Sequence, residues 1–231
     1  MPESGSLDRW RGRFIVLDGP DGCGKTTQLH LLAAHLEERG LDVRTARDPG
    51  GTAIGDKIRD LLLDRDNGEI DPMCEMMLFM ASRAQLVAEV VRPALAAGRV
   101  VLCDRFVSAT VAYQGASGID PKLIVQVGEV AVAGLWPELT IVLDVPPEVG
   151  MSRVGSRSDW TETSPDAAGT GSPVGDRMEV RGAEYHAKVR ENYRRLGEVY
   201  PAPVVGIDAA RPREEVFADL LAALEKAGGH A

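Results

Sequence analysis

The chain has 231 residues, of which 44% are hydrophobic, and it carries a formal net charge of −9 at pH 7. That length supports one well-buried core and is short for two, so we expect a single domain over residues 1–231, and the acidic balance argues against broad affinity for nucleic acid. The polar tail at residues 1–12 and the lack of an apolar run of about 18 residues argue against a secretion signal and a membrane helix, and three cysteines are too few for a disulfide framework. We therefore expect a soluble cytoplasmic protein.

Short apolar runs and helix-like patterns alternate along the chain. The run at residues 14–17 leads into a glycine-rich turn, and a helical pattern follows until Gly40. Further apolar runs predict buried parallel strands at residues 42–46, 99–103, 140–145 and 203–207. Helical patterns lie at residues 54–62, from Pro72 onward, at 122–133 and at 217–224. Asp71-Pro72 and Asp120-Pro121 have the composition of helix starts.

This alternation predicts a three-layer α/β fold in which helices flank about five parallel strands joined by right-handed crossovers. Ligands of such a sheet bind at the carboxyl ends of its strands. Residues 156–175 interrupt the pattern, because they are rich in Ser, Thr, Gly, Pro and Asp and have little apolar periodicity. They form either a solvated insertion or part of a mobile lid at about residues 153–177, and the arginines at its start, Arg153 and Arg157, favour the lid.

The segment from Gly19 to Thr26 matches the pattern G-x-x-x-x-G-K-[ST] between a strand and a helix. Backbone N–H groups of such a turn and the helix N-terminus surround nucleotide phosphates, which indicates a P-loop NTPase fold. Lys25 should reach the β- and γ-phosphates, and Thr26 should hold Mg²⁺ together with a carboxylate that follows an apolar strand, for which Asp104 is the candidate. The predicted ATP and phosphate contacts are Gly19, Pro20, Asp21, Gly22, Cys23, Gly24, Lys25, Thr26 and Thr27.

Cys23 and the histidines suggest further chemistry that we weigh against simpler explanations. A helix start can lower the pKa of a thiol and make it reactive, but we favour a permissive loop position for Cys23. His30 and His35 are five residues apart and lie on different faces of a helix, so no zinc site is predicted.

Beyond the phosphate loop the chain contains RDPGGT at 47–52, LFMASRAQ at 78–85, DRF at 104–106, AYQG at 112–115 and DRME at 176–179. In order and spacing these blocks resemble the thymidylate kinase family, from about Phe14 to Tyr193. The resemblance implies a dTMP kinase that uses Mg²⁺ and ATP to make dTDP for dTTP biosynthesis. It also implies a homodimer, and the apolar stretch around Met73, Met76 and Met77 could form the interface, unless these residues belong to the core. From the net charge and the lack of a long apolar run we expect no nucleic acid or membrane partner.

The resemblance also assigns roles around the acceptor. Phe79 would stack on thymine, Arg83 would donate to an exocyclic oxygen of the base, and Tyr113 would fill the space of a ribose 2′-hydroxyl. The full set implied for dTMP is Asp21, Asp48, Arg59, Phe79, Arg83, Arg105, Thr110, Tyr113 and Gln114. The catalytic set is Lys25, Asp104, Arg105 and the lid arginines Arg153 and Arg157, one of which would contact ATP.

Simpler explanations remain open at several positions. By pattern alone Phe79 is a core aromatic on a Met-rich helix, and Arg59 can lie on a solvated helix face beside Asp56 and Asp60. Asp48 replaces the usual glutamate of the family, and this shorter side chain is expected to weaken a contact near the acceptor. The alternatives for the whole chain are another nucleoside or nucleotide kinase, and a non-catalytic nucleotide-binding regulator on the same fold.

Overall fold

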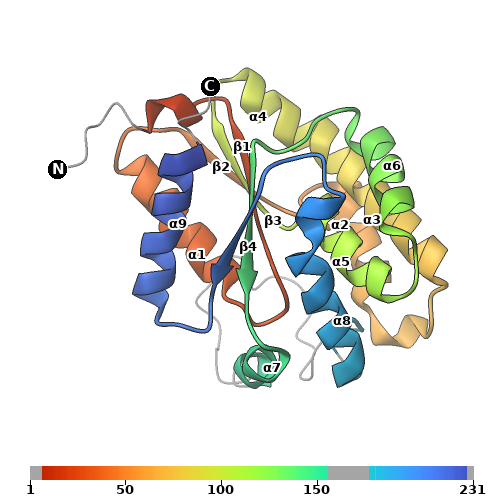
Figure 1. Ribbon diagram of the computed structural model, residues 1–231. Helices are drawn as coiled ribbons and strands as arrows, with labels where there is room; N and C mark the ends of the chain where they lie inside the picture. Colours follow the sequence, from red (N-terminus) through yellow and green to blue (C-terminus); the bar gives the residue numbers. More distant parts are fainter. Residues whose placement is uncertain (1–6, 156–176, 180, 228–231) are drawn as a thin grey trace.

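In the part of the chain that the computed structural model describes, residues 7–155, 177–179 and 181–227, five parallel strands form one sheet (Figure 1). They lie in the order β2-β3-β1-β4-β5. Their bounds are β1 Phe14–Asp18, β2 Val43–Arg47, β3 Val100–Asp104, β4 Leu139–Asp144 and β5 Val204–Asp208. The expected parallel α/β sheet is confirmed, and each predicted apolar run is a strand to within one residue at either end.

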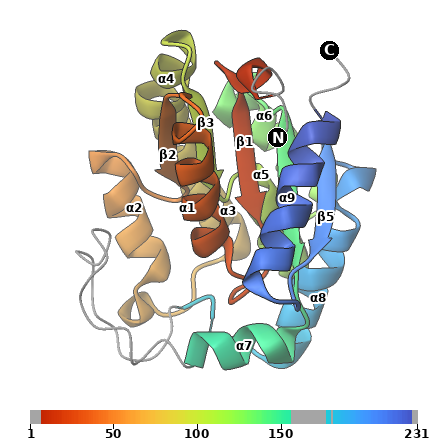
Figure 2. The ribbon, with the colours of Figure 1, turned by 90° about the vertical axis from the view of Figure 1, so that its left-hand side faces the viewer.

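Helices cover both faces of the sheet and make three layers (Figures 1 and 2). The division begins in the central strand β1, whose successive side chains point to opposite faces. Ile15 and Leu17 share a core with α1 and α9, whereas Phe14 and Val16 share the other core with α3, α5, α6 and α8. The helices are α1 Lys25–Glu37, α2 Ala53–Leu63, α3 Pro72–Leu86, α4 Arg92–Ala96, α5 Val107–Ala116, α6 Pro121–Val132, α7 Pro147–Gly155, α8 Ala183–Arg194 and α9 Arg213–Ala227, with short helical turns at Asp8–Trp10, Arg65–Asn67, Val87–Val91 and Leu196–Glu198.

The two predicted helix starts are confirmed by their caps. Asp71 Oδ1 accepts from the backbone N–H of Met73 at 2.9 Å, and Asp120 Oδ1 accepts from that of Lys122 at 3.0 Å. Each cap precedes a proline in the first turn, where the missing N–H costs no helical hydrogen bond. These caps fix the entry of α3 and α6.

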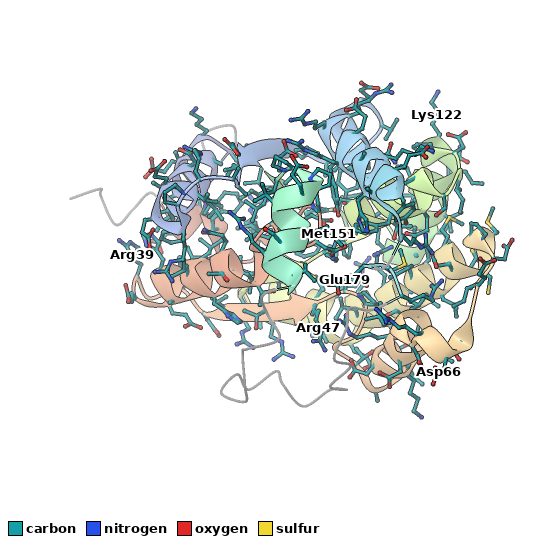
Figure 3. The ribbon with its side chains drawn as sticks, turned by 90° about the horizontal axis from the view of Figure 1, so that it is seen from below. Arg39, Arg47, Asp66, Lys122, Met151 and Glu179 are labelled. Atoms are coloured by element: carbon teal, nitrogen blue, oxygen red, sulfur yellow. The ribbon has the colours of Figure 1, made fainter. Side chains whose placement is uncertain are left out.

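The carboxyl ends of the strands all lie on one side of the molecule, where α7 crosses beneath them (Figure 1). Seen from below, α7 with Met151 lies across the middle of this side (Figure 3). Within the described ranges, no helix has the length and apolar character needed to cross a bilayer.

Candidate active site

The glycine-rich turn after β1 folds around the amino group of Lys25. Gly19, Gly22 and Gly24 have φ values of +140°, +74° and +93°, which residues with side chains rarely adopt. Lys25 Nζ donates to the carbonyl oxygens of Gly19 and Pro20, each at 3.0 Å. None of the described side chains caps the start of α1, so its N–H groups and the lysine charge meet at the same loop. This segment is suited to holding a phosphate.

Thr26 and Asp104 meet at the carboxyl edge of the sheet because β1 and β3 are neighbours. Leu17 of β1 pairs with Asp104 in the register, and Thr26 Oγ1 donates to Asp104 Oδ2 at 3.0 Å. Hydroxyl and carboxylate oxygens are ligands that Mg²⁺ prefers, usually together with water and substrate phosphates. The two residues predicted as metal contacts therefore lie together, and their oxygens fit such an ion.

Arg105 connects the phosphate loop with a side pocket. Its Nη2 donates to Asp21 Oδ1 at 2.5 Å, its Nη1 donates to Gly19 O at 3.2 Å, and Asp21 Oδ2 accepts from Tyr113 Oη at 2.6 Å. Burial opposes the charge of Asp21, but Arg105 and Lys25 outweigh it and hold the pKa of Asp21 below its usual value. Asp21 is therefore an ionised carboxylate at neutral pH.

The side pocket has a volume of about 510 Å³, including its open mouth, and we call it the arginine pocket because three arginines line it. Its walls come from α2, α3, α5, the turns after β1, β2 and β3, and Met178. The structure brings to it every residue implied above for dTMP: Asp21, Asp48, Arg59, Phe79, Arg83, Arg105, Thr110, Tyr113 and Gln114.

Arg83 is fixed in the wall of the arginine pocket. Its Nε donates to Asp48 Oδ2 at 2.6 Å in an ion pair closed to solvent. Its Nη2 donates to Phe106 O at 3.0 Å and to Thr110 Oγ1 at 3.1 Å, and its Nη1 donates to Met80 Sδ at 3.0 Å. These acceptors account for four of the five guanidinium N–H bonds, so one N–H of Nη1 is the donor that a ligand can meet. Asp48 thus forms a short buried ion pair with Arg83, and the weaker contact near the acceptor expected from its shorter side chain stays a prediction.

The simpler explanations for Phe79 and Arg59 are wrong. Phe79 is partly exposed and lines the pocket outside both cores, so it is not a core aromatic. Arg59 is partly buried, lines the same pocket, and donates from Nη1 to Pro49 O at 2.9 Å. Both side chains therefore form part of the pocket wall.

Comparisons with known proteins identify the family of this chain. Residues 17–220 match the family model described as thymidylate kinase. The chain belongs to the thymidylate kinase family. It is 45% identical over 214 residues to a thymidylate kinase of Geotalea uraniireducens, covering 92% of this chain and 96% of that protein. It is 39% identical over 210 residues to one of Maridesulfovibrio salexigens, covering 90% of this chain and 93% of the relative.

A solved structure extends the comparison to the fold. The crystal structure of thymidylate kinase from Ehrlichia chaffeensis matches with a TM-score of 0.70 and 26% sequence identity, and the match covers 93% of this chain and 99% of that one. This likeness confirms the P-loop NTPase fold of the thymidylate kinase family for this chain.

The segment that precedes the expected lid packs directly on the phosphate loop. An added Cβ on Gly150 of α7 would lie 2.4 Å from Asp21 O, and one on Gly22 would lie 2.1 Å from Gly150 O. Arg153, also on α7, donates from Nη1 to Ala209 O at 3.1 Å and to Gly22 O at 3.5 Å. Arg157 and the body of the expected lid lie outside the described residues.

Cys23 behaves as the favoured interpretation expects. The side chain is buried, and burial raises the pKa of its thiol above the ordinary value, although Lys25 and Arg105 act in the other direction. The alternative of a thiol with a lowered pKa is wrong, because the helix start does not overcome desolvation here.

Sequence reasoning missed three buried polar residues of this thymidylate kinase fold. Asp18 accepts from Ser108 Oγ and Tyr193 Oη, each at 2.5 Å. Glu75 accepts from Gln114, Arg177 and Arg181. Asp18 and Glu75 could have been found as charged residues next to or within apolar stretches, whereas Tyr193 lies on α8, a helix that the sequence analysis did not predict.

Proposed function

We propose that the chain transfers the γ-phosphoryl group of Mg²⁺-ATP to dTMP, giving dTDP and ADP, as a step toward dTTP. The observation that carries this proposal is the shared use of Asp21 and Arg105, which belong both to the phosphate-loop network and to the arginine pocket. ATP bound at the phosphate loop and dTMP bound in the arginine pocket would then both lie beside Arg105. Positioning of this kind is the larger part of catalysis in phosphoryl transfer.

The reaction needs no protein base. The second pKa of a phosphate monoester is about 6, so the acceptor is mostly a dianion at neutral pH and is already a nucleophile. In the proposed roles Lys25 and Arg105 neutralise charge on the transferred group, and Arg59 holds the acceptor phosphate with its forked donors. Thr26 and Asp104 would hold Mg²⁺, which, when bound, supplies charge neutralisation and a template for the phosphates.

Base and sugar selection follow from fixed donors in the pocket. Arg83 offers one N–H to O4 of thymine, while cytosine places an amino donor there and would oppose it. Phe79 offers a stacking face, and the Tyr113 ring would occupy the space of a 2′-hydroxyl. We therefore expect dTMP and dUMP to bind better than dCMP, and deoxyribose to be preferred over ribose.

We also propose a homodimer. Large apolar side chains are exposed on three helices that pack side by side, α2, α3 and α6. They are Ile54, Leu61, Met73, Met77, Leu123 and Val130. Exposed apolar side chains on neighbouring helices are suited to pairing with a second copy. Light scattering after size-exclusion chromatography tests it, and a monomer at micromolar concentration would contradict it.

A coupled ADP-release assay tests the reaction. Mg²⁺-ATP is offered with dTMP, dUMP, dCMP, dGMP, UMP or thymidine, and a sample without acceptor measures hydrolysis. Turnover with dTMP and little with dCMP or thymidine supports the proposal. Faster turnover of another acceptor supports the other kinase alternative, and ATP binding without turnover of any acceptor supports the regulator.

A further inference from the structure

Glu75 is a buried carboxylate beside the arginine pocket, and the proposed reaction gives it no role. It lies in the first turn of α3 and is 0% exposed. Its Oε1 accepts from Gln114 Nε2 at 2.8 Å, and its Oε2 accepts from Arg181 Nη2 at 2.8 Å and from Arg177 Nη2. The two arginines compensate a charge that would otherwise be costly to bury.

The chemistry of this contact determines which end of the Gln114 amide faces Glu75. An ionised carboxylate only accepts hydrogen bonds, so the NH₂ group must point toward it. The opposite orientation would set two acceptor oxygens against each other in a buried site. Gln114 is 1% exposed and lines the arginine pocket, so its carbonyl oxygen Oε1 is the amide atom left to accept from a ligand.

We propose that Glu75 is a positioning residue for base selection, which holds the Gln114 amide so that Oε1 accepts from N3–H of the acceptor base. This inference rests on the proposed dTMP kinase function and deepens it. Arg83 gives the donor for O4 and Gln114 gives the acceptor for N3–H, which together match thymine and uracil. Cytosine presents the reverse pattern, an amino donor at C4 and an unprotonated N3, so Glu75 enforces discrimination without contacting the base.

The same carboxylate also anchors the chain where it re-enters the fold after residue 176. Arg177 Nε donates to Leu62 O at 2.9 Å, its backbone N–H donates to Leu63 O at 3.2 Å, and the next residue, Met178, lines the pocket. A substitution at Glu75 therefore affects both the amide and this anchor. The test must separate the two effects.

The substitution Glu75→Gln does so when three acceptors are compared. This substitution keeps the size of the side chain, but an amide can donate a hydrogen bond to Gln114 Oε1 as well as accept one from Nε2. The Gln114 amide can then rotate by about 180° and present its NH₂ group to the pocket. The ratio of kcat/KM for dTMP to that for dCMP should fall about tenfold or more. The ratio for dTMP to dUMP should not change, because these bases share N3–H and O4 and differ only in the 5-methyl group. General loosening of the pocket would change both ratios.

Two further variants show whether Glu75 acts through Gln114. In a Gln114→Leu background, Glu75→Gln should cause no additional fall in the dTMP to dCMP ratio, because the group it acts through is gone. Arg181→Met removes one partner of Glu75 but leaves a carboxylate opposite the amide, so the ratio should stay at the wild-type value. If Arg181→Met lowers the dTMP to dCMP ratio as much as Glu75→Gln does, the inference is overturned, because the effect would then come from the balance of buried charge and not from the orientation of the Gln114 amide.

The exchanged pair Glu75→Gln with Gln114→Glu keeps the test decisive if the single variant does not fold. It retains one amide, one carboxylate and the total charge, and it still presents an acceptor oxygen to the pocket, so the dTMP to dCMP ratio should be kept. A fall in this ratio, or an unchanged ratio in folded Glu75→Gln, overturns the inference. If the unsubstituted chain does not phosphorylate dTMP, the proposed function itself fails.

Discussion

Asp48 and Arg83 form an ion pair whose side chains are 0% and 1% exposed, with Oδ2 and Nε 2.6 Å apart. It joins the turn after β2 to α3, which are far apart in sequence, and it fixes the guanidinium that we assign to base recognition. Removing one partner of such a pair leaves an uncompensated charge in the interior, whereas the same loss on the surface costs little.

Asp48→Asn should therefore destabilise the fold by about 3–5 kcal/mol, because Arg83 stays charged without its partner. Urea unfolding followed by circular dichroism measures the change. The matched control is Glu198→Gln in the exposed Arg195–Glu198 pair, for which the free energy of unfolding should not change measurably. Equal effects of the two substitutions would contradict the prediction.

Gly150→Ala tests the contact between α7 and the phosphate loop. The added methyl group would lie 2.4 Å from Asp21 O, so either α7 or the loop must move. We expect a loss of about 1–3 kcal/mol in the free energy of unfolding. KM for ATP should rise more than KM for dTMP, since the displaced loop holds the phosphates. Gly197→Ala, whose Cβ meets no heavy atom within 4 Å, is the control and should leave both constants unchanged.

The sequence predicted the inner strands β1, β3 and β4 well because they are buried on both faces and are therefore continuous apolar runs. The edge strands β2 and β5 are partly exposed, and the run of β2 is interrupted by polar residues. It did not predict α5, because this helix is buried on nearly every side and has no polar face to give a helical period. α8 has the reverse composition, with His186, Val189 and Tyr193 as its buried residues among many charges. Their spacing of three and four is helical, and this sparse pattern was overlooked.

The parts of the candidate site that a local sequence motif identifies could be predicted. The phosphate loop and the Thr26–Asp104 contact follow from local pattern and from the adjacency of β1 and β3. Partners that come together only through the fold were not predictable. Glu75 is close to Gln114 because α3 and α5 pack together, and nothing in the local sequence of either helix specifies that contact.

The Asp144 carboxylate should make a pH-dependent contribution to the stability of the fold. Burial opposes its charge, but hydrogen bonds from Arg190 and Arg194 outweigh burial and lower the pKa of Asp144 below 3.8. A carboxylate with a depressed folded-state pKa stabilises the fold above its unfolded pKa, and this contribution is lost as pH falls through the folded pKa. Asp144→Asn should thus be less stable than wild type near neutral pH, and the difference should shrink below about pH 4. Urea titrations over this range measure it, and a constant difference would refute the assignment.

The three thiols should differ in reactivity. Cys74 is exposed, while Cys23 and Cys103 are buried, and burial raises the pKa of both buried thiols. A neutral thiol is a poor nucleophile, so a thiol reagent at neutral pH should label Cys74 rapidly and the other two only after unfolding. Mass spectrometry of labelled peptides identifies the site, and Cys74→Ser should abolish the rapid phase. Rapid labelling of native Cys23 would contradict its raised pKa.

Asp104→Asn tests the proposed metal position. Asp104 Oδ2 lies 3.0 Å from Thr26 Oγ1, and an amide is a weaker ligand for Mg²⁺ than a carboxylate. We expect kcat/KM to fall about a hundredfold or more, since the metal supplies several kcal/mol of charge stabilisation in phosphoryl transfer. The Mg²⁺ concentration for half-maximal activity should rise. A variant with reduced activity but unchanged Mg²⁺ dependence would show that Asp104 acts otherwise.

The Thr26 hydroxyl gives an independent check of the same metal position. Thr26→Ser keeps the oxygen and should keep the Mg²⁺ dependence, whereas Thr26→Val removes it at similar volume and should shift that dependence in the same direction as Asp104→Asn. Because the two side chains would share one ion, the double variant Thr26→Val with Asp104→Asn should lose less activity than the two separate losses predict. Full additivity would mean that the hydroxyl and the carboxylate act on different steps, and the shared metal position would then be wrong.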